Sequence, residues 1–384
     1  MPVTLGNIAA YGLVVHDGTS SSRRAGRIYL IMTLVAEFAL LFAFIMIYWR
    51  TGTLTPSPAQ LIGAGTAEIA LLMLAFGIKA GLIGLHVWLP LAHPAAPVPA
   101  SAVLSGAMIK TALIGWMRFL PFGHESLPEW GLLLLAAGAA GALIAVPLGL
   151  PQQNPKVVLA YSSIGKMGTL VSALGLALIE PQAAAGIIAA VTLFAAHHGL
   201  AKGALFLGVG VVKSSHSHWM FLLLLIPALA LAGLPFTSGA SAKALLSLSA
   251  LEAAGKWSWI FFWMLPIAAV GTALLMARFL YLMHQLTEKQ HAFSLLPALP
   301  WLALLSLILL LPLTFGNVPA LIESGWPIAV ASTIAILILR ARPAWLLSLV
   351  GRVPPGDLIG LLSAVRARCG SLTETWLSRV GGNL

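Results

Sequence analysis

Long runs of apolar residues, separated by short polar connections, dominate the pattern along this chain. The main runs cover about 28–49, 61–86, 98–118, 130–150, 157–179, 184–212, 218–249, 258–283, 298–315 and 326–341. A helix needs about 20 residues to cross a bilayer, so the pattern predicts an all-α polytopic membrane protein with about ten transmembrane helices. A further stretch, Val3 to Val15, is too short to cross alone and is typical of the end of a longer helix.

The composition supports the same fold class. Of the 384 residues, 59% are apolar and 8% are charged, whereas roughly 25% are charged in an ordinary soluble domain. These values exclude a soluble enzyme, a nucleic-acid-binding domain and a disordered tail. The single cysteine, Cys369, excludes a disulfide framework, a cysteine-rich zinc site and an iron–sulfur cluster built from this chain alone. We also find no dinucleotide-binding motif, and we therefore predict no cofactor and no metal.

The charges between the apolar runs predict how the chain is oriented in the membrane. Arg23, Arg24 and Arg27 lie in one loop, and alternation across successive segments places Lys156 and Lys213 on the same side. Lys and Arg favour the cytoplasmic side of a membrane. We therefore predict a multi-pass protein of a bacterial-type inner membrane, with a cytoplasmic C-terminus and no cleaved signal peptide.

Two of the apolar runs contain helix-breaking residues beside a lysine. Lys79 is followed by Gly81, and Gly233 and Pro235 precede Lys243. Paired interruptions of this kind in two halves of a chain indicate the working site of a transporter built from repeats. Glycine and proline alone indicate little, because they are common in membrane helices. The pattern is informative because a lysine within a membrane helix is rare.

Ionisable residues within the apolar runs are the candidate functional groups. They are Glu37, Glu68, Lys79, Lys110, Lys166, His197, His198, Lys202 and Lys243. A charge at the bilayer centre costs about 2.5–3.5 kcal/mol on insertion scales, so such residues usually face a polar interior. Lysine and histidine can both exchange protons near neutral pH when buried, which suits a proton relay. Helix–helix hydrogen bonding is the favoured interpretation for the following residues: Tyr161, Ser162, Ser163, Lys166 and His197.

Several ordered motifs between about residues 9 and 285 resemble one membrane-protein family. They are Phe76-Gly-Ile-Lys79, Leu85-His86-Val-Trp-Leu-Pro90, Ile109-Lys110, His198-Gly-Leu-Ala-Lys202 and Ser241-Ala-Lys243. Together they resemble the antiporter-like subunits of respiratory complex I, of membrane-bound hydrogenases and of Mrp-type cation/proton antiporters. The resemblance implies two inverted five-helix repeats, each with one broken helix, and a chain of protonatable groups at mid-membrane depth.

The resemblance also implies roles for single residues. The implied proton-relay residues are Lys79, Lys110, His198, Lys202 and Lys243, and candidate partners are Glu37, Glu68, Lys166 and His86. The family's buried glutamate, which pairs with the broken-helix lysine, would fall upstream of Met1. We therefore expect the first repeat to be incomplete in this chain, with Glu37 or Glu68 as candidate replacements.

These observations give a predicted domain organisation. A partial helix and a cytoplasmic loop cover 1–27, the rest of the first repeat covers 28–121, and the second repeat covers 130–285. Further transmembrane helices cover 298–341. The tail, 342–384, is interpreted either as an amphipathic helix at the cytoplasmic interface or as a partly ordered segment.

Three functional hypotheses follow. The first is a proton-translocating subunit of a complex I-like or hydrogenase-like assembly (NADH:quinone oxidoreductase type), which moves protons while partner subunits carry out the redox chemistry. The second is a subunit of a cation/proton antiporter or of a proton-driven system for inorganic-carbon uptake. The third is a non-conducting structural subunit. The predicted partners are other membrane subunits, the lipid bilayer and protons, with sodium as a further ion in antiport, and no nucleic acid.

Overall fold

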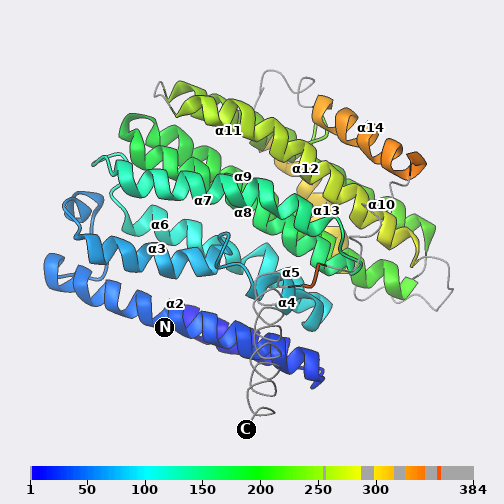
Figure 1. Ribbon diagram of the computed structural model, residues 1–384, viewed down its shortest axis with the longest axis horizontal. Coiled ribbons are helices and arrows are strands. Elements are labelled where there is room, and N and C mark those ends of the chain that lie inside the picture. The colour runs from blue at the N-terminus through cyan, green and yellow to red at the C-terminus, as the bar shows by residue number, and fades with distance from the viewer. Residues whose placement is uncertain are drawn as a thin grey trace, which may run out of the picture.

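The computed structural model describes residues 2–215, 217–253, 257–286, 298–314, 325–341 and 353–355. The regular secondary structure of these residues is helical, as predicted. Six helical segments among them are long and apolar enough to cross a membrane: Ser20–Thr51, Val98–Phe119, Pro128–Gly149, Pro155–Ile179, Pro181–Ser215 and Trp259–His284. The helices form an elongated bundle, with α2 along one edge and α14 at the opposite edge (Figure 1).

The first part of the bundle contains four α-helices and a short 3-10 turn. They are α1 (Pro2–Val14), α2 (Ser20–Thr51), the turn Pro58–Leu61, α3 (Thr66–Ala80) and α4 (Trp88–Ala95). Thr19 caps α2, because its Oγ1 accepts a hydrogen bond from the Ser22 amide at 3.1 Å. This cap starts the helix several residues before the apolar run that predicted it.

The next predicted span, 98–118, is interrupted. It consists of α5 (Val98–Gly106), a 3-10 turn (Met108–Lys110) and α6 (Thr111–Phe119). Ala107, at φ −120° and ψ −54°, lies outside the helical region and separates α5 from the turn. Lys110 therefore lies at a break, whereas the sequence predicted a position within a continuous helix.

Three helices in the middle of the bundle pack very closely. They are α7 (Pro128–Gly149), α8 (Pro155–Ile179) and α9 (Ala184–Ser215), the last preceded by a 3-10 turn at Pro181–Ala183. Gly138 of α7 faces Gly168 of α8, and a Cβ added to Gly138 would lie 2.5 Å from the Gly168 carbonyl oxygen. Small residues of this kind let membrane helices pack backbone against backbone. The tight α7–α8 pair holds α8 in place beside α9.

The last part of the described chain contains five α-helices. They are α10 (His218–Ala232), α11 (Ser238–Glu252), α12 (Ser258–His284), α13 (Ala298–Leu310), continued by a 3-10 turn at Leu311–Thr314, and α14 (Trp326–Ala341). The predicted run 218–249 thus forms two helices separated at Gly233, which confirms the second predicted interruption. The helix predicted in the tail lies outside the described residues, apart from 353–355.

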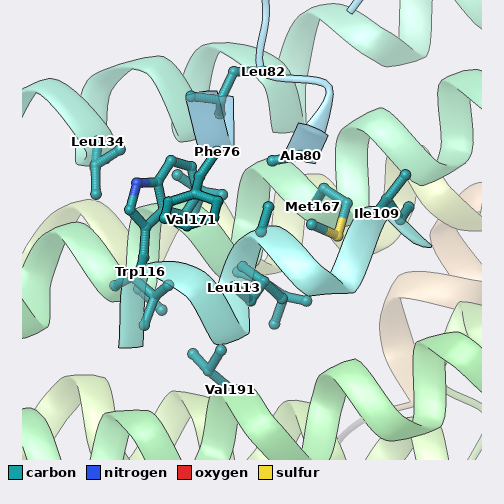
Figure 2. Packing of buried hydrophobic residues seen from close by; sticks show 14 of the residues in the cluster. Phe76, Ala80, Leu82, Ile109, Leu113, Trp116, Leu134, Met167, Val171 and Val191 are labelled. Atoms are coloured by element: carbon teal, nitrogen blue, oxygen red, sulfur yellow. The ribbon is translucent and has the colours of Figure 1, made fainter. Parts of the chain in front are cut away.

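The apolar core joins the two halves of the bundle. Figure 2 shows Phe76 and Trp116 packed near Leu113 and Val171, and the Phe76 and Trp116 rings meet edge to face at 6.1 Å. By contrast, α2 exposes a row of large apolar side chains, including the half-exposed Phe38. A water-facing helix would carry polar groups here, so this face is suited to lipid or to another membrane helix.

Candidate functional site

The first broken helix ends with a glycine that L-residues cannot easily replace. Gly81 follows α3 with φ +69° and ψ 43°, and its amide donates to the Gly77 and Ile78 carbonyls. This left-handed conformation stops the helix within one turn of Lys79. Gly84, at φ +87°, turns the chain again before α4 begins. The predicted interruption after Lys79 is therefore present and is built from the glycines that signalled it.

Lys79 is ion-paired with a carboxylate from a different helix. Its Nζ lies 2.5 Å from Oε1 of Glu37, which is on α2. The Asn7 amide of α1 donates to the same oxygen at 2.7 Å. The side chains are 10% exposed for Lys79 and 20% for Glu37, so the pair is largely withdrawn from the surface. Of the two candidate carboxylates, Glu37 is the one that contacts the lysine.

A cavity of about 250 Å³ lies beside this ion pair. Asn7, Tyr29, Lys79, Trp88 and Thr111 contribute to its walls. The hydroxyl of Tyr29 lies 3.5 Å from Oδ1 of Asn7, which continues the polar lining away from the carboxylate. Its walls are mainly apolar, with Asn7, Lys79 and Thr111 supplying polar groups, and a space of this size can hold several water molecules. Water can therefore reach the lysine amine.

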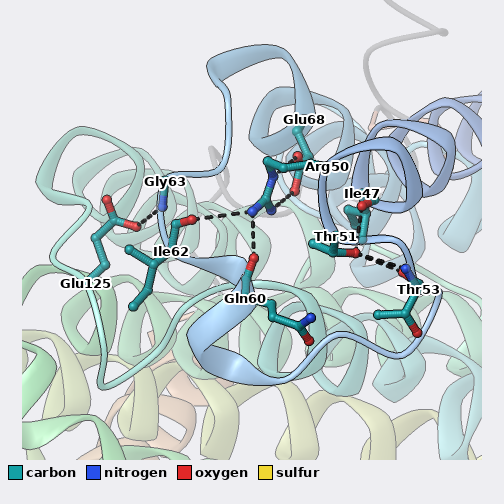
Figure 3. Close-up of polar contacts among 9 residues, drawn as sticks. All are labelled: Ile47, Arg50, Thr51, Thr53, Gln60, Ile62, Gly63, Glu68 and Glu125. Carbon is teal, nitrogen blue, oxygen red and sulfur yellow. Dashed lines mark hydrogen bonds and ion pairs between the residues drawn. The ribbon is translucent and has the colours of Figure 1, made fainter.

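Glu68, the other candidate carboxylate, pairs with Arg50 and not with Lys79. Both of its carboxylate oxygens accept hydrogen bonds from the Arg50 guanidinium, at 2.8 and 3.1 Å (Figure 3). Arg50 also donates to the backbone oxygens of Gln60 and Ile62, so the pair fixes the connection between α2 and α3. Eleven residues of α3 separate Glu68 from Lys79, which amounts to about 16 Å along the helix.

Two backbone carbonyls and a hydrogen-bonded pair of serines lie between two buried lysines in the middle of the bundle. Lys110 donates to the Ser105 carbonyl, and the Ser105 hydroxyl is 2.7 Å from the Ser163 hydroxyl on α8. Ser163 donates to the Leu159 carbonyl at 3.0 Å, and the Lys202 amine of α9 donates to the same oxygen at 2.8 Å. Helices α5 and α8 thus supply the serine hydroxyls and carbonyls that lie between the two amines. The helix–helix hydrogen bond expected for Ser163 is confirmed.

The buried histidines lie around this connection. His198 is fully buried one turn before Lys202, and neither ring nitrogen has a hydrogen-bond partner among the described residues. His93 of α4 is also fully buried and stacks on Phe206 at 4.4 Å. His86 has a local role, because its Nδ1 accepts from the Gly84 amide at 3.2 Å within the first break. We did not select His93 from the sequence, although it lies just after that break.

The second broken helix repeats the arrangement of a lysine near an interruption. Gly233 has φ +92°, and Phe236 adopts the left-handed conformation at φ +63°. Lys243 of α11 reaches back across the break and donates to the Ala232 carbonyl at 3.2 Å. Lys166 of α8 is also buried, and its amine lies 5.5 Å from the centre of the Phe194 ring on α9.

The acceptors that the lysine amines contact differ along the bundle: a carboxylate at Lys79 and backbone carbonyls further along. Among the described residues, the two ion pairs are Lys79–Glu37 and Arg50–Glu68. The buried amines of Lys110 and Lys202 and the partly buried amine of Lys243 instead donate to backbone carbonyls. The described part of the chain contains no cluster of three or more His, Cys, Asp or Glu residues that would hold a metal ion. The site therefore gathers amines and imidazoles, which are side chains able to take up and release protons.

The fold and the site define this chain as a helical membrane protein with two broken helices and buried lysines, and comparison with known proteins gives its family. The sequence model of the family described as NADH:quinone oxidoreductase/Mrp antiporter, TM, matches residues 3–275. The chain belongs to this family.

Individual relatives agree with the family assignment. Hydrogenase-4 component B of Escherichia coli (strain K12) is 31% identical over 278 residues, which are 64% of this chain and 41% of that protein. NADH-ubiquinone oxidoreductase chain 4 of Gadus morhua is 30% identical over 335 residues, which are 79% of this chain and 68% of that protein. The chain thus spans about two fifths of the length of the hydrogenase component and about two thirds of the Gadus protein.

The fold is also similar to a solved structure. The structure of the Mrp complex from Dietzia sp. DQ12-45-1b contains a chain that superposes with a TM-score of 0.70 at 22% identity. The match covers 97% of this chain and 46% of that chain. The antiporter-like fold expected from the sequence is therefore confirmed.

Proposed function

We propose that this chain is a proton-translocating membrane subunit of a multisubunit redox complex. In this proposal protons pass from the cavity at Lys79 to Lys110, then to His198 and Lys202, and finally to Lys243. Lys166 and His86 are accessory groups, and Glu68 anchors a loop and is not part of the relay. The chain carries no electrons, and partner subunits supply the energy.

The observation that carries the proposal is the burial of Lys110 and Lys202 on either side of the hydrogen-bonded Ser105–Ser163 pair. Two amines buried in an apolar core each cost several kcal/mol unless they are hydrogen-bonded or lose their charge. Packing alone would be satisfied by leucine or methionine at these positions. The serine pair adds hydroxyl groups between the two amines, and in this proposal water joins each amine to a hydroxyl, because the backbone carbonyls that the amines bond cannot hand on a proton.

Water completes the route in this proposal. The fully buried nitrogens of His198 need hydrogen-bond partners, and a water molecule is the smallest group that can supply them. One protonated amine raises the cost of protonating the next, because like charges repel strongly in a low-dielectric interior. Loading one lysine therefore pushes the proton on the following group forward, and a charge change in a neighbouring subunit can start the sequence.

The proposal also includes the orientation of the chain in the membrane, the boundary between its repeats and its partners. The positive loop around Arg24 lies on the cytoplasmic side of a bacterial-type inner membrane, and the C-terminus lies on that side too. The repeats meet between residues 121 and 130. The relatives named above are components of a hydrogenase and of NADH-ubiquinone oxidoreductase, which favours membrane subunits of such an assembly as partners.

The test uses the assembled complex in liposomes. Lys79→Ala and Lys243→Ala should each reduce proton uptake by at least about 100-fold, as expected for groups that transfer protons directly. A fluorescent pH probe inside the vesicles measures the uptake, and the redox activity of the complex is measured in parallel. Full proton stoichiometry in both variants would leave only a structural role. Uptake that requires sodium would instead favour cation/proton antiport.

A further inference from the structure

Helix α9 carries two neighbouring histidines that face different parts of the bundle. Consecutive side chains leave an α-helix about 100° apart. His198 shares its face with Lys202, four residues on, which bonds to α8. His197 points elsewhere, because its Nδ1 lies 2.8 Å from the Ser238 hydroxyl at the start of α11. The two rings therefore lie on the two sides of α9 that adjoin the central lysines and the second broken helix.

The His197 ring lies directly against the second break. A Cβ added to Gly239, the residue after Ser238, would lie 3.0 Å from Nε2 of His197. The Ser238 hydroxyl is hydrogen-bonded to the other ring nitrogen, Nδ1. The ring is fully buried, and Nε2 has no hydrogen-bond partner among the described residues. One nitrogen is thus held by α11 while the other is open to a mobile partner such as water.

The amine of Lys243 approaches the same place from within α11. Side chains on a helix lean toward its N-terminus, and Lys243 follows this rule by reaching back to the Ala232 carbonyl at 3.2 Å. A Cβ added to Gly233 would collide with the Nζ of Lys243, so the amine lies directly at the break. The amine and the His197 ring therefore both border the second break.

We infer that His197, with Ser238 as its partner, carries protons across α9 from the Lys202 side to Lys243. This inference rests on the proposed function and adds a residue to it. A proton arriving at Nε2 forms one N–H bond and gives an imidazolium. The Nδ1 proton then passes to the Ser238 oxygen while the original hydroxyl proton leaves, through water, for the neutral amine of Lys243. The ring ends neutral, the serine keeps one proton, and the lysine gains one.

A purely structural role for His197 makes a different prediction. In that case the ring serves as a hydrogen-bonded link between α9 and α11, and any polar side chain of similar reach would replace it. Glutamine has that reach and can bond to Ser238, but it cannot take up and release a proton at neutral pH. The variant His197→Gln therefore separates the two roles.

The experiment measures proton uptake by the assembled complex in liposomes, with His197→Gln, Ser238→Ala and His284→Gln compared to the unaltered protein. His284 is exposed at the end of α12 and controls for loss of an imidazole elsewhere. We expect about 100-fold slower uptake for His197→Gln, the lower part of the range for a positioned proton-transfer group. Ser238→Ala should give a smaller loss, and His284→Gln should give none.

The outcomes distinguish this inference from the function on which it rests. Normal uptake in His197→Gln, together with blocked uptake in Lys79→Ala, would overturn the role of His197 and leave the relay intact. Normal uptake in Lys79→Ala and Lys243→Ala would overturn the relay itself. If His197→Gln fails to assemble, Ser238→Ala decides, because unchanged uptake in an assembled Ser238→Ala complex contradicts the proposed transfer.

Discussion

Replacing Glu37 by glutamine removes the negative charge beside Lys79 while it keeps the size and shape of the side chain. In the protein, Glu37 accepts from the lysine at 2.5 Å and from Asn7 at 2.7 Å. The glutamine oxygen can still accept a hydrogen bond, so the local packing should survive. The ammonium group of Lys79, however, loses its counter-charge in a setting where it is only 10% exposed.

The size of the effect follows from this burial. Removing one partner of a buried ion pair costs about 3–5 kcal/mol, because the other charge is left uncompensated. Glu37 is 20% exposed, which favours the lower end, about 3 kcal/mol. Since 1.36 kcal/mol corresponds to a factor of ten, the charged form of Lys79 becomes about 100-fold less favoured relative to the neutral form. If protons enter the relay at this amine, their uptake should fall by a similar factor.

The assay compares Glu37→Gln with Glu68→Gln in the assembled, liposome-reconstituted complex. The control makes the same chemical change one helix away, where both carboxylate oxygens bind Arg50 at the loop between α2 and α3. Glu68→Gln should loosen that loop but leave uptake by the assembled protein within about twofold, because Glu68 pairs with Arg50 away from Lys79 and lies outside the proposed relay. Equal losses in the two variants, or normal uptake in Glu37→Gln, would refute the reasoning.

Two further predictions concern the helices that hold the relay in place. Gly138→Ala should destabilise the protein by about 1–3 kcal/mol, the usual cost of overpacking, because the added methyl group meets the α8 backbone. Gly141→Ala should have little effect, because the atom nearest to its added methyl group would be 3.7 Å away. Thermal unfolding in detergent compares the two variants. Ser163→Ala should slow proton uptake about tenfold, from the roughly 1.4 kcal/mol of one buried hydrogen bond. Uptake at the original rate in assembled Ser163→Ala would show that protons bypass the serine pair.

The sequence predicted the features that depend on local backbone chemistry. Gly81 and Gly233 mark both breaks because each must adopt a positive φ, which few other residues tolerate. The buried lysines could be recognised because charge is rare in a membrane helix. The break at Ala107 was not predicted, since alanine is a good helix former and the neighbouring Gly106 serves mainly to let α5 approach the Gly199 carbonyl of α9.

The partners of the charged residues could not be predicted from sequence. Glu37 and Lys79 are 42 positions apart and meet only because α2 lies against α3 and α4. Glu68 shares α3 with Lys79, which made it an equal candidate, yet it reaches Arg50 at the other end of that helix. Likewise, the sequence shows that His197 and His198 point to different faces of one helix, but only the position of α11 brings Ser238 to His197. Such pairings depend on tertiary packing, which a single sequence does not encode in a readable pattern.

The breaks also provide the buried amines of the proposed relay with acceptors weaker than a carboxylate. The last carbonyls of a helix lack an intrahelical partner, and Lys110 and Lys243 donate to such carbonyls, at Ser105 near the end of α5 and at Ala232 at the end of α10. A carbonyl dipole satisfies an ammonium group but holds it less strongly than a carboxylate does. Lys79, with Glu37 beside it, is therefore suited to capture a proton from the cavity. The carbonyl-bonded amines further along hold a proton less strongly, so in the proposed function its transfer onto them requires the energy that partner subunits supply.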